Sequence, residues 1–310
     1  MERTVAIIGA GSVGSTIASY LVWSGVYSEI YMIDIDKNRC EGEVMDLSDA
    51  SFVTSTVVKV GTWQDAKKAS MIIITAGAKQ RQGETRRALL QRNVRILRAI
   101  ANSILPVSSY TNILLVANPV DILTQLFQEI SGIPKSRVFG SGTYLDSMRL
   151  REALAEKVKV APKNIHAYVV GMHGDLQVPL WSLANVAGCK ASEYARLSKT
   201  ERKQLAEDTK NKAYKIIKAK GSTYYGIAAC VAKLSRAISG NHREVFQLSV
   251  WSEDYGSYLS WPALVGSKGI LRSLPLSISK QEREVVLRAA KHIRDGVSNA
   301  LGNDRISSKL

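Results

Sequence analysis

The stretch that decides the fold is TVAIIGAGSVG, residues Thr4–Gly14. Its first five residues are β-branched or apolar and predict a buried strand, and its glycine-rich turn leads into a helical segment, Ser15–Ser24. A second apolar strand, Ile30–Ile33, follows and ends at Asp34, 20 residues beyond Gly14. A G-x-G-x-x-G turn between a strand and a helix, with a carboxylate at this distance, predicts a dinucleotide-binding βαβ unit.

The residues of this turn have distinct physical roles in binding a dinucleotide. Gly9 permits the tight turn, Gly11 lets the backbone approach a pyrophosphate, and Gly14 lets the helix pack closely on the strand. Ser12 and Val13 begin the segment whose unpaired N–H groups face the phosphates. A tight strand-to-helix turn without a ligand is the alternative, and the complete βαβ pattern disfavours it.

Asp34 indicates which dinucleotide is bound. Its carboxylate would accept hydrogen bonds from the ribose hydroxyls and would repel a 2′-phosphate. The next residue is Ile35 rather than an arginine that could pair with such a phosphate. The sequence therefore predicts NAD as the cofactor, in preference to NADP.

The rest of the chain predicts an α/β protein. Further strand-like runs, Met71–Thr75 and Ile113–Ala117, alternate with helical segments such as Arg86–Asn102, and this alternation is typical of a Rossmann-type, doubly wound parallel sheet. We expect an NAD-binding domain over residues 1–140 and an α+β catalytic domain over residues 141–310. The second half is expected to contain the strands His166–Gly171 and Phe246–Trp251, a long basic helix Glu201–Gly221 and an amphipathic helix Gln281–Val297.

Composition excludes some classes of function. The 310 residues are 45% hydrophobic and carry 42 Lys and Arg against 27 Asp and Glu, a net charge of +15. Most of the excess lies beyond residue 140, notably in residues 196–220, where acidic residues interrupt the basic ones. This spacing favours a solvated helix face over a nucleic-acid surface. No run approaches the roughly 18 apolar residues of a membrane span, so we expect neither nucleic acid nor membrane as a partner.

The cysteines and histidines of the chain exclude further classes of protein. The three cysteines, Cys40, Cys189 and Cys230, form no CxxC motif and no disulfide framework, which indicates a reducing compartment. No metal site is expected, because His242 and His292 have no ligand-like neighbours. The start of the chain has no signal-peptide pattern.

The last three residues are Ser308-Lys309-Leu310, which match the address read by a peroxisomal import receptor. The alternative is a polar tail after the last helix. We expect a peroxisome-type organelle if the source is a eukaryote and a cytoplasmic protein otherwise.

Four segments concentrate residues that carry chemistry, namely 75–86, 116–121, 140–149 and 171–175. Their order and spacing resemble the lactate/malate dehydrogenase family, from Val5 to about Val297. The resemblance implies hydride transfer between a small 2-hydroxy acid and NAD, with lactate and pyruvate as the expected pair. It also implies a homotetramer, or a dimer. The alternatives are another 2-hydroxy acid such as malate, or a non-catalytic NAD-binding protein.

The resemblance implies a role for each matching residue. His173 is the expected acid–base residue, and Asp146 the carboxylate that holds its tautomer. Arg149 is the expected clamp for the substrate carboxylate, and Arg86 the lid residue that polarises the reacting carbonyl. An imidazole suits proton exchange near neutral pH, and a forked guanidinium suits a carboxylate. The remaining residues expected to contact the cofactor or substrate are Ala76, Gly77, Asn118, Ser141, Thr223 and Ile227.

Gln80 is expected to decide the substrate. It lies six residues before the lid arginine, where malate dehydrogenases carry an arginine for a second carboxylate. A neutral Gln80 favours an uncharged group such as the methyl of pyruvate, although a one-residue register shift would present Arg81 instead. Glu84 would also repel a dicarboxylate if its side chain points inward.

Two further features depart from, or extend, the family pattern. Met172 and Leu176 stand where the family commonly has Glu and Ser, and these apolar residues are expected to alter the pKa of His173. Arg151 and His166 match positions at which many bacterial relatives bind fructose 1,6-bisphosphate, so they are candidate allosteric residues. The alternative is that Arg151 lies on a helix face and His166 only begins a strand.

Overall fold

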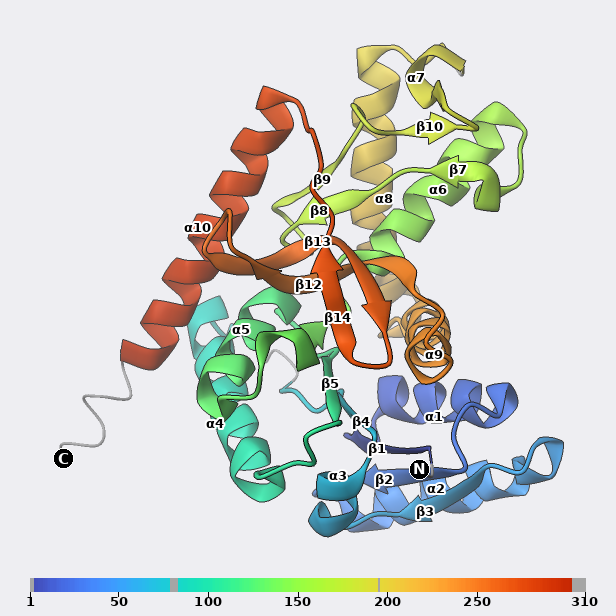
Figure 1. The fold of residues 1–310 in the computed structure, drawn as a ribbon, viewed down its shortest axis with the longest axis vertical. Coiled ribbons are helices and arrows are strands. Elements are labelled where there is room, and N and C mark those ends of the chain that lie inside the picture. Colours follow the sequence, from blue (N-terminus) through green and yellow to red (C-terminus); the bar gives the residue numbers. More distant parts are fainter. Residues whose placement is uncertain (1–2, 79–82, 195, 303–310) are drawn as a thin grey trace.

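The computed structural model describes residues 3–78, 83–194 and 196–302 (Figure 1). Its helices are α1 (Ser12–Ser24), α2 (Lys37–Asp49), α3 (Trp63–Lys68), α4 (Arg86–Ile104), α5 (Val120–Ser131), α6 (Tyr144–Val158), α7 (Ala191–Tyr194), α8 (Lys199–Lys220), α9 (Tyr225–Ser239) and α10 (Lys280–Gly302). Short 3-10 turns are η1 (Ser51–Val53), η2 (Lys135–Arg137) and η3 (Pro162–Asn164). The strands are β1 (Thr4–Ile8), β2 (Glu29–Ile33), β3 (Val57–Val60), β4 (Met71–Ile74), β5 (Asn112–Leu115), β6 (Val138–Gly140), β7 (Ile165–His166), β8 (Val169–Gly171), β9 (Gln177–Pro179), β10 (Asn185–Val186), β11 (Cys189–Lys190), β12 (Glu244–Ser252), β13 (Ser257–Gly266) and β14 (Gly269–Ser273).

The first half of the chain forms the predicted parallel sheet, with strand order β3-β2-β1-β4-β5-β6. Every neighbouring pair in this series is parallel. Strands β4 and β5 are buried along their whole length, as both faces of the sheet are covered by helices. Helices α1, α2 and α9 lie together, and α4, α5 and α10 form a second group (Figure 1). The Rossmann-type prediction is confirmed.

The second half continues the same sheet in antiparallel fashion. Strand β12 pairs with β6, and β13, β8 and β9 follow in order, with β14 also on β13. A separate three-stranded sheet, β11-β10-β7, lies at the far end with α6, α7 and α8 (Figure 1). The α+β expectation for this half is therefore confirmed. Among the described residues, no helix is long and apolar enough to cross a membrane.

The strand predicted over residues 166–171 is wrong as a single element. It is divided into β7 and β8, which belong to different sheets. Two backbone carbonyls of this segment accept hydrogen bonds from side chains at α6: Arg151 Nε of the helix donates to Ala167 O at 3.0 Å, and Oγ1 of Thr143, the residue before the helix, donates to Val169 O at 2.5 Å. Such side-chain bonds interrupt a continuous strand ladder.

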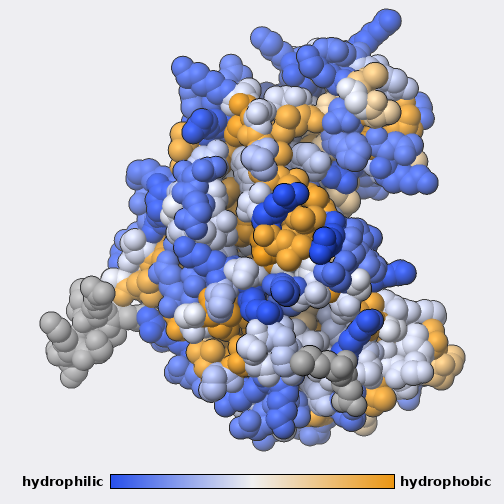
Figure 2. All heavy atoms as spheres, in the orientation of Figure 1, coloured by the Kyte–Doolittle hydropathy of each residue, from blue (hydrophilic) through white to orange (hydrophobic). Residues whose placement is uncertain are grey.

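The basic helix α8 supports the interpretation of its charge as a solvated face. Only Leu205 and Thr209 are buried on it, and its lysines form ion pairs with acidic residues of α6 and of α8 itself. The helix begins two residues earlier than predicted, at a Ser198–Glu201 capping box, and Gly221 caps its C-terminus. Figure 2, in which α8 lies mostly behind nearer elements, shows hydrophilic residues along much of the outer edge of the molecule.

Candidate active site

The glycine turn packs as the sequence predicts. A Cβ atom on Gly14 would lie 1.8 Å from the carbonyl oxygen of Gly9, so α1 can approach β1 only through a glycine. Gly9 has a φ of 111°, a conformation that disfavours other residues. Asp34, at the end of β2, accepts a hydrogen bond from the Ala10 N–H at 2.6 Å through Oδ2. The carboxylate therefore lies directly beside the turn.

The same turn leaves room for a dinucleotide. A Cβ atom on Gly11 would meet nothing within 4 Å, and no side chain caps the N-terminus of α1. Ser12 and Val13 thus begin a helix whose first N–H groups remain available to a phosphate. Ala76 and Gly77 follow β4 on the adjacent strand, and Ala76 N–H donates to Ile8 O at 2.9 Å. These residues fit NAD, with the pyrophosphate at the turn and the ribose at Asp34.

A second set of residues meets at the start of α6. His173 Nδ1 donates to Asp146 Oδ2 at 2.7 Å, and Arg149 Nη1 lies 3.5 Å from Asp146 Oδ1. Asp146 and Arg149 are nearly buried, whereas 29% of the His173 side chain is exposed. Nδ1 is occupied by Asp146, and Nε2 has no hydrogen-bond partner among the described residues. This ring nitrogen is therefore free to exchange a proton with a ligand.

Helix α6 also fixes the strand that leads to His173. Both backbone polar groups of Val169 in β8 are hydrogen-bonded to side chains at this helix. The carbonyl accepts a hydrogen bond from Thr143 Oγ1, and the N–H donates one to Ser147 Oγ at 2.9 Å. His173 then follows β8 by two residues. The same helix thus supplies Asp146 and Arg149 and aligns the strand that carries the histidine.

The charges of this cluster shift both pKa values. Burial lowers the pKa of His173, but the charge and hydrogen bond of Asp146, together with the charge of Asp121, outweigh it and raise the pKa above its usual value. Burial raises the pKa of Asp146, but the neighbouring His173 and Arg149 reverse this and leave it lowered. Asp146 is therefore ionised, and His173 holds its proton to a higher pH than a free imidazole.

Asp121 is a site residue that the sequence reasoning missed. It is 1% exposed and accepts a hydrogen bond from the backbone N–H of His173 at 2.8 Å. Its segment, 116–121, stood out in the sequence, but only Asn118 was assigned a role. The signal available was a carboxylate in the first turn of α5.

Asn118 and Ser141 lie at the ends of neighbouring parallel strands. Asn118 follows β5, is exposed, and has its backbone carbonyl held by Asn93 Nδ2 at 3.2 Å. Ser141 follows β6 and donates its N–H to Leu115 O at 2.8 Å. Asn93 Oδ1 also accepts from Ala78 N–H at 2.7 Å. Asn93, a second missed residue, therefore ties the segment after β4 to the turn after β5.

Thr223 and Ile227 approach from another direction. Thr223 lies between α8 and α9, and Ile227 lies in the first turn of α9. Gly226 touches Leu145 of α6, since a Cβ atom there would lie 3.0 Å from Leu145 Cδ1. Burial raises the pKa of Cys230, one turn further on, to about 12, with a contribution from the Asp146 charge. This helix face therefore lies against the His173 cluster.

Comparison with known proteins identifies this arrangement. Residues 3–140 match the model of the lactate/malate dehydrogenase NAD-binding domain, and residues 143–302 match that of the lactate/malate dehydrogenase alpha/beta C-terminal domain. The chain belongs to the lactate/malate dehydrogenase family. The NAD cofactor predicted from the glycine turn is confirmed by this membership.

Individual family members are similar over nearly their whole length. An L-lactate dehydrogenase of Clostridium botulinum (strain Loch Maree / Type A3) is 37% identical over 308 residues, covering 96% of this chain and 97% of its own. L-lactate dehydrogenase A of Rhizopus oryzae is 37% identical over 294 residues, covering 95% and 92%. The crystal structure of the minor L-lactate dehydrogenase from Enterococcus mundtii, in its ligands-bound form, superposes with a TM-score of 0.92 at 34% identity, covering 96% and 98%.

The segment expected to form a lid, residues 75–86, is described only in part. Gln80 and Arg81 lie outside the described residues, and so does the Arg86 side chain, although Arg86 begins α4 after the cap formed by Thr85. The Glu84 carboxylate lies 3.4 Å from Arg92 Nη1. Glu84 is therefore paired with a residue of α4.

The candidate allosteric residues are neighbours in this family member. Arg151 donates to the carbonyl of Ala167, the residue after His166, and its guanidinium carbon lies 5.5 Å from the Tyr168 ring centroid. Arg151 is half-buried and His166 is exposed.

Next to the His173 cluster, Met172 and Leu176 are both half-buried, and Met172 packs against the main core.

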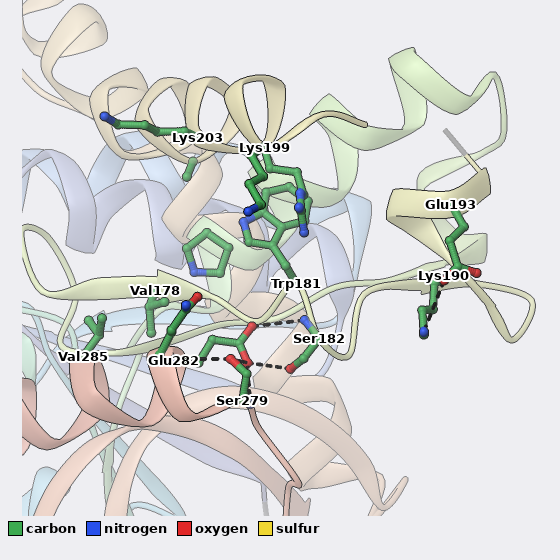
Figure 3. Close-up of a pocket in the computed structure, with 14 residues that line it drawn as sticks. Val178, Trp181, Ser182, Lys190, Glu193, Lys199, Lys203, Ser279, Glu282 and Val285 are labelled. Atoms are coloured by element: carbon green, nitrogen blue, oxygen red, sulfur yellow. Dashed lines mark hydrogen bonds and ion pairs between the residues drawn. The ribbon is translucent and has the colours of Figure 1, made fainter. Parts of the chain in front are cut away.

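A cavity of about 780 Å³ lies elsewhere, between α8, β9 and the start of α10 (Figure 3). Glu282 accepts hydrogen bonds there from Ser182 and Ser279, so its carboxylate is already satisfied. No predicted site residue lines this cavity. Among the described residues, no group of three or more His, Cys, Asp and Glu is placed to hold a metal ion.

Proposed function

We propose that this chain is an NAD-dependent L-lactate dehydrogenase that interconverts L-lactate and pyruvate. The observation that carries the proposal is the buried Asp146 held between His173 and Arg149. This arrangement places a proton carrier, His173, and a carboxylate clamp, Arg149, on either side of one buried carboxylate. The L-lactate dehydrogenases to which the chain is 37% identical support the choice of substrate.

The histidine performs the proton transfer. When bound, NAD would supply the acceptor for the hydride that leaves the carbinol carbon of lactate. His173 Nε2 removes the hydroxyl proton in that direction and returns it to the pyruvate carbonyl oxygen in the other. Asp146 fixes the tautomer through Nδ1 and stabilises the imidazolium that forms.

The arginines bind and polarise the substrate. Arg149 has one ion pair, at 3.5 Å, among the described residues, which leaves donors on its fork for the substrate carboxylate. We assign Arg86, at the start of α4, to the reacting oxygen, where a cation stabilises developing negative charge. Asn118 and Thr223 are assigned to substrate and nicotinamide contacts, and Ser141 and Ile227 to the orientation of the nicotinamide ring.

Gln80 supports pyruvate over oxaloacetate. Its neutral amide offers no partner for a second carboxylate, and burying such a charge without a partner is costly. Malate dehydrogenase activity is the alternative, and longer 2-keto acids come third. The carboxylate of Glu84 is paired with Arg92, so Gln80 is the residue to which we assign the preference.

Initial rates of NADH oxidation with pyruvate and with oxaloacetate test this assignment. We expect kcat/KM for pyruvate to exceed that for oxaloacetate by at least about a hundredfold. The variant Gln80→Arg should move the preference towards oxaloacetate, and Gln82→Arg is the matched control. A wild-type preference for oxaloacetate would overturn the substrate assignment, and no turnover with either would favour a non-catalytic NAD-binding protein.

The organisation of the chain is part of the same proposal. We place the boundary between the NAD-binding and catalytic domains near residue 140, between the two family matches. A homotetramer, or a dimer, is proposed from family resemblance, and light scattering tests it. We propose activation by fructose 1,6-bisphosphate through Arg151 and His166. Titrating the sugar bisphosphate while measuring activity tests this, and an activity that does not change with its concentration would refute it.

The location is proposed from the sequence alone. Ser308-Lys309-Leu310 lies outside the described residues and would direct import into a peroxisome-type organelle in a eukaryote. In any other source we propose a cytoplasmic enzyme. Fluorescent fusions with and without these three residues test the address, and a cytosolic signal from both contradicts it.

A further inference from the structure

Helix α5 carries a buried carboxylate that faces the catalytic histidine. Asp121 Oδ2 accepts the backbone N–H of His173 at 2.8 Å, and Oδ1 accepts Ser260 Oγ at 2.8 Å. The helix belongs to the parallel-sheet half, whereas His173 and Ser260 belong to the second half. Asp121 therefore joins the two halves at the residue that carries the proton.

A neutral residue makes the comparable contact one turn further along α5. Gln125 Oε1 accepts hydrogen bonds from Ser257 Oγ at 3.0 Å and from Tyr258 N–H at 3.1 Å, both on β13. An amide oxygen is thus sufficient to dock α5 on this strand. A buried carboxylate costs far more desolvation energy than an amide, so docking alone gives no reason for Asp121.

The charges around His173 provide that reason. Three charged groups act on the ring from the packed elements: Asp146 and Arg149 on α6, and Asp121 on α5. No Lys or Arg pairs with Asp121 among the described residues. Two carboxylates and one guanidinium sum to −1, so a protonated His173 makes this buried cluster neutral.

We propose that Asp121 is a positioning residue that anchors the backbone of His173 to α5 and favours the protonated imidazole. Asn118, which we assign to the substrate, lies three residues earlier on the same turn. One segment would thus position both the residue that contacts the substrate and the backbone of His173, which carries the proton. Burial raises the pKa of Asp121 above its usual value, and the hydrogen bonds from His173 and Ser260 reduce this shift by favouring the ionised form. In return, the Asp121 charge contributes to the raised pKa of His173.

Titration of the His173 ring by NMR tests the proposal without cofactor or substrate. The chain has four histidines, and the variant His173→Asn assigns the signal. Asp121→Asn keeps the shape and one acceptor but removes the charge, and we expect its His173 titration midpoint at lower pH than in the wild type. Gln125→Met is the matched control, because it removes the neighbouring contact to β13 without changing charge, and its midpoint should equal that of the wild type.

Kinetics provide a second readout, which rests on the proposed function. Pyruvate reduction needs protonated His173, so in Asp121→Asn the ratio of kcat/KM at pH 6 to that at pH 8 should rise by about threefold or more. If Asp121→Asn does not fold, Ser260→Ala should shift the midpoint in the same direction by less, because it removes one hydrogen bond from the carboxylate.

Two results would overturn the role of Asp121. One is an unchanged His173 midpoint in Asp121→Asn, or in Ser260→Ala if that variant replaces it. The other is an equal shift in Gln125→Met, which would show that any loss of the contact between α5 and β13 has the same effect. A wild-type protein that reduces no 2-keto acid would refute the proposed function, while the NMR titration would still decide the role of Asp121.

Discussion

The turn after β1 and the turn after β8 present their binding groups in opposite ways. The glycine turn offers backbone N–H groups and open space, and a side chain at Gly14 or Gly11 would obstruct packing or ligand. The turn at His173 offers an imidazole whose position depends on Asp146 and Asp121, side chains from two other helices. The pyrophosphate contact that we propose thus lies in one stretch of chain, whereas the proposed proton chemistry is assembled from three.

This difference predicts that the two functions can be damaged separately. Substitutions in the His173 cluster should impair chemistry or substrate binding and spare NADH affinity. Substitutions in the glycine turn should impair NADH affinity first. The following variants test that separation, starting with the largest expected effect.

Arg149→Lys should give the largest loss in this series. Lysine keeps the charge but loses the forked geometry, so kcat/KM for pyruvate should fall by about a hundred- to a thousandfold, mainly through KM. The Kd for NADH, measured by fluorescence, should stay within about threefold of the wild type. Arg137→Lys, on η2, is the control for a half-buried arginine. An equal loss in both variants would argue against a clamp at Arg149.

Gly14→Ala should damage the cofactor half, because the new Cβ would meet the Gly9 carbonyl. We expect a loss of about 2–4 kcal/mol in the free energy of unfolding, together with weaker NADH binding. Gly11→Ala separates the two effects, because its Cβ meets only open space: stability should hold while NADH affinity falls. If Gly11→Ala binds NADH like the wild type, the pyrophosphate does not approach this turn.

Asp34→Asn should relax the choice of cofactor. The amide keeps a hydrogen-bond acceptor but no longer repels a 2′-phosphate, so the ratio of kcat/KM with NADH to that with NADPH should fall about tenfold. Asp36→Asn, at the N-cap of α2, is the matched control and should leave the ratio unchanged. An unchanged ratio in Asp34→Asn would remove Asp34 from cofactor selection.

Met172→Glu and Leu176→Ser should have the smallest effect, confined to the pH profile. Either change makes the surroundings of His173 more polar, which favours the charged imidazole and raises its pKa. Pyruvate reduction requires that charged form, so activity should persist to higher pH, with the ratio of kcat/KM at pH 8 to that at pH 6 rising by about twofold. Identical profiles in both variants and the wild type would refute the tuning by these apolar residues.

The same contrast explains how much the sequence could predict. The βαβ unit was predictable with Asp34 in place, because strand, turn, helix and carboxylate follow one another within a short stretch. His173, Asp146 and Arg149 came from family resemblance, and no spacing in the sequence brings residues 146 and 173 together. Their contact depends on β8 lying beside α6.

Asp121 and the break between β7 and β8 show where local patterns fail. The apolar alternation of residues 166–171 looks like one strand, but donors from α6 take its carbonyls. Asp121 looks like an ordinary first-turn acid, which favours a helix N-terminus in any protein. Only the packed structure shows that its carboxylate is buried against the backbone of His173.

The variant His173→Asn tests the central claim most directly, when NADH affinity and pyruvate turnover are measured on the same sample. Asparagine can still hydrogen-bond but cannot carry a proton near neutral pH. We predict a Kd for NADH within about threefold of the wild type and a loss of at least about a thousandfold in the rate of NADH oxidation. Turnover within tenfold of the wild type, or NADH affinity lost together with the histidine, would contradict the assignment of binding and proton transfer to separate turns.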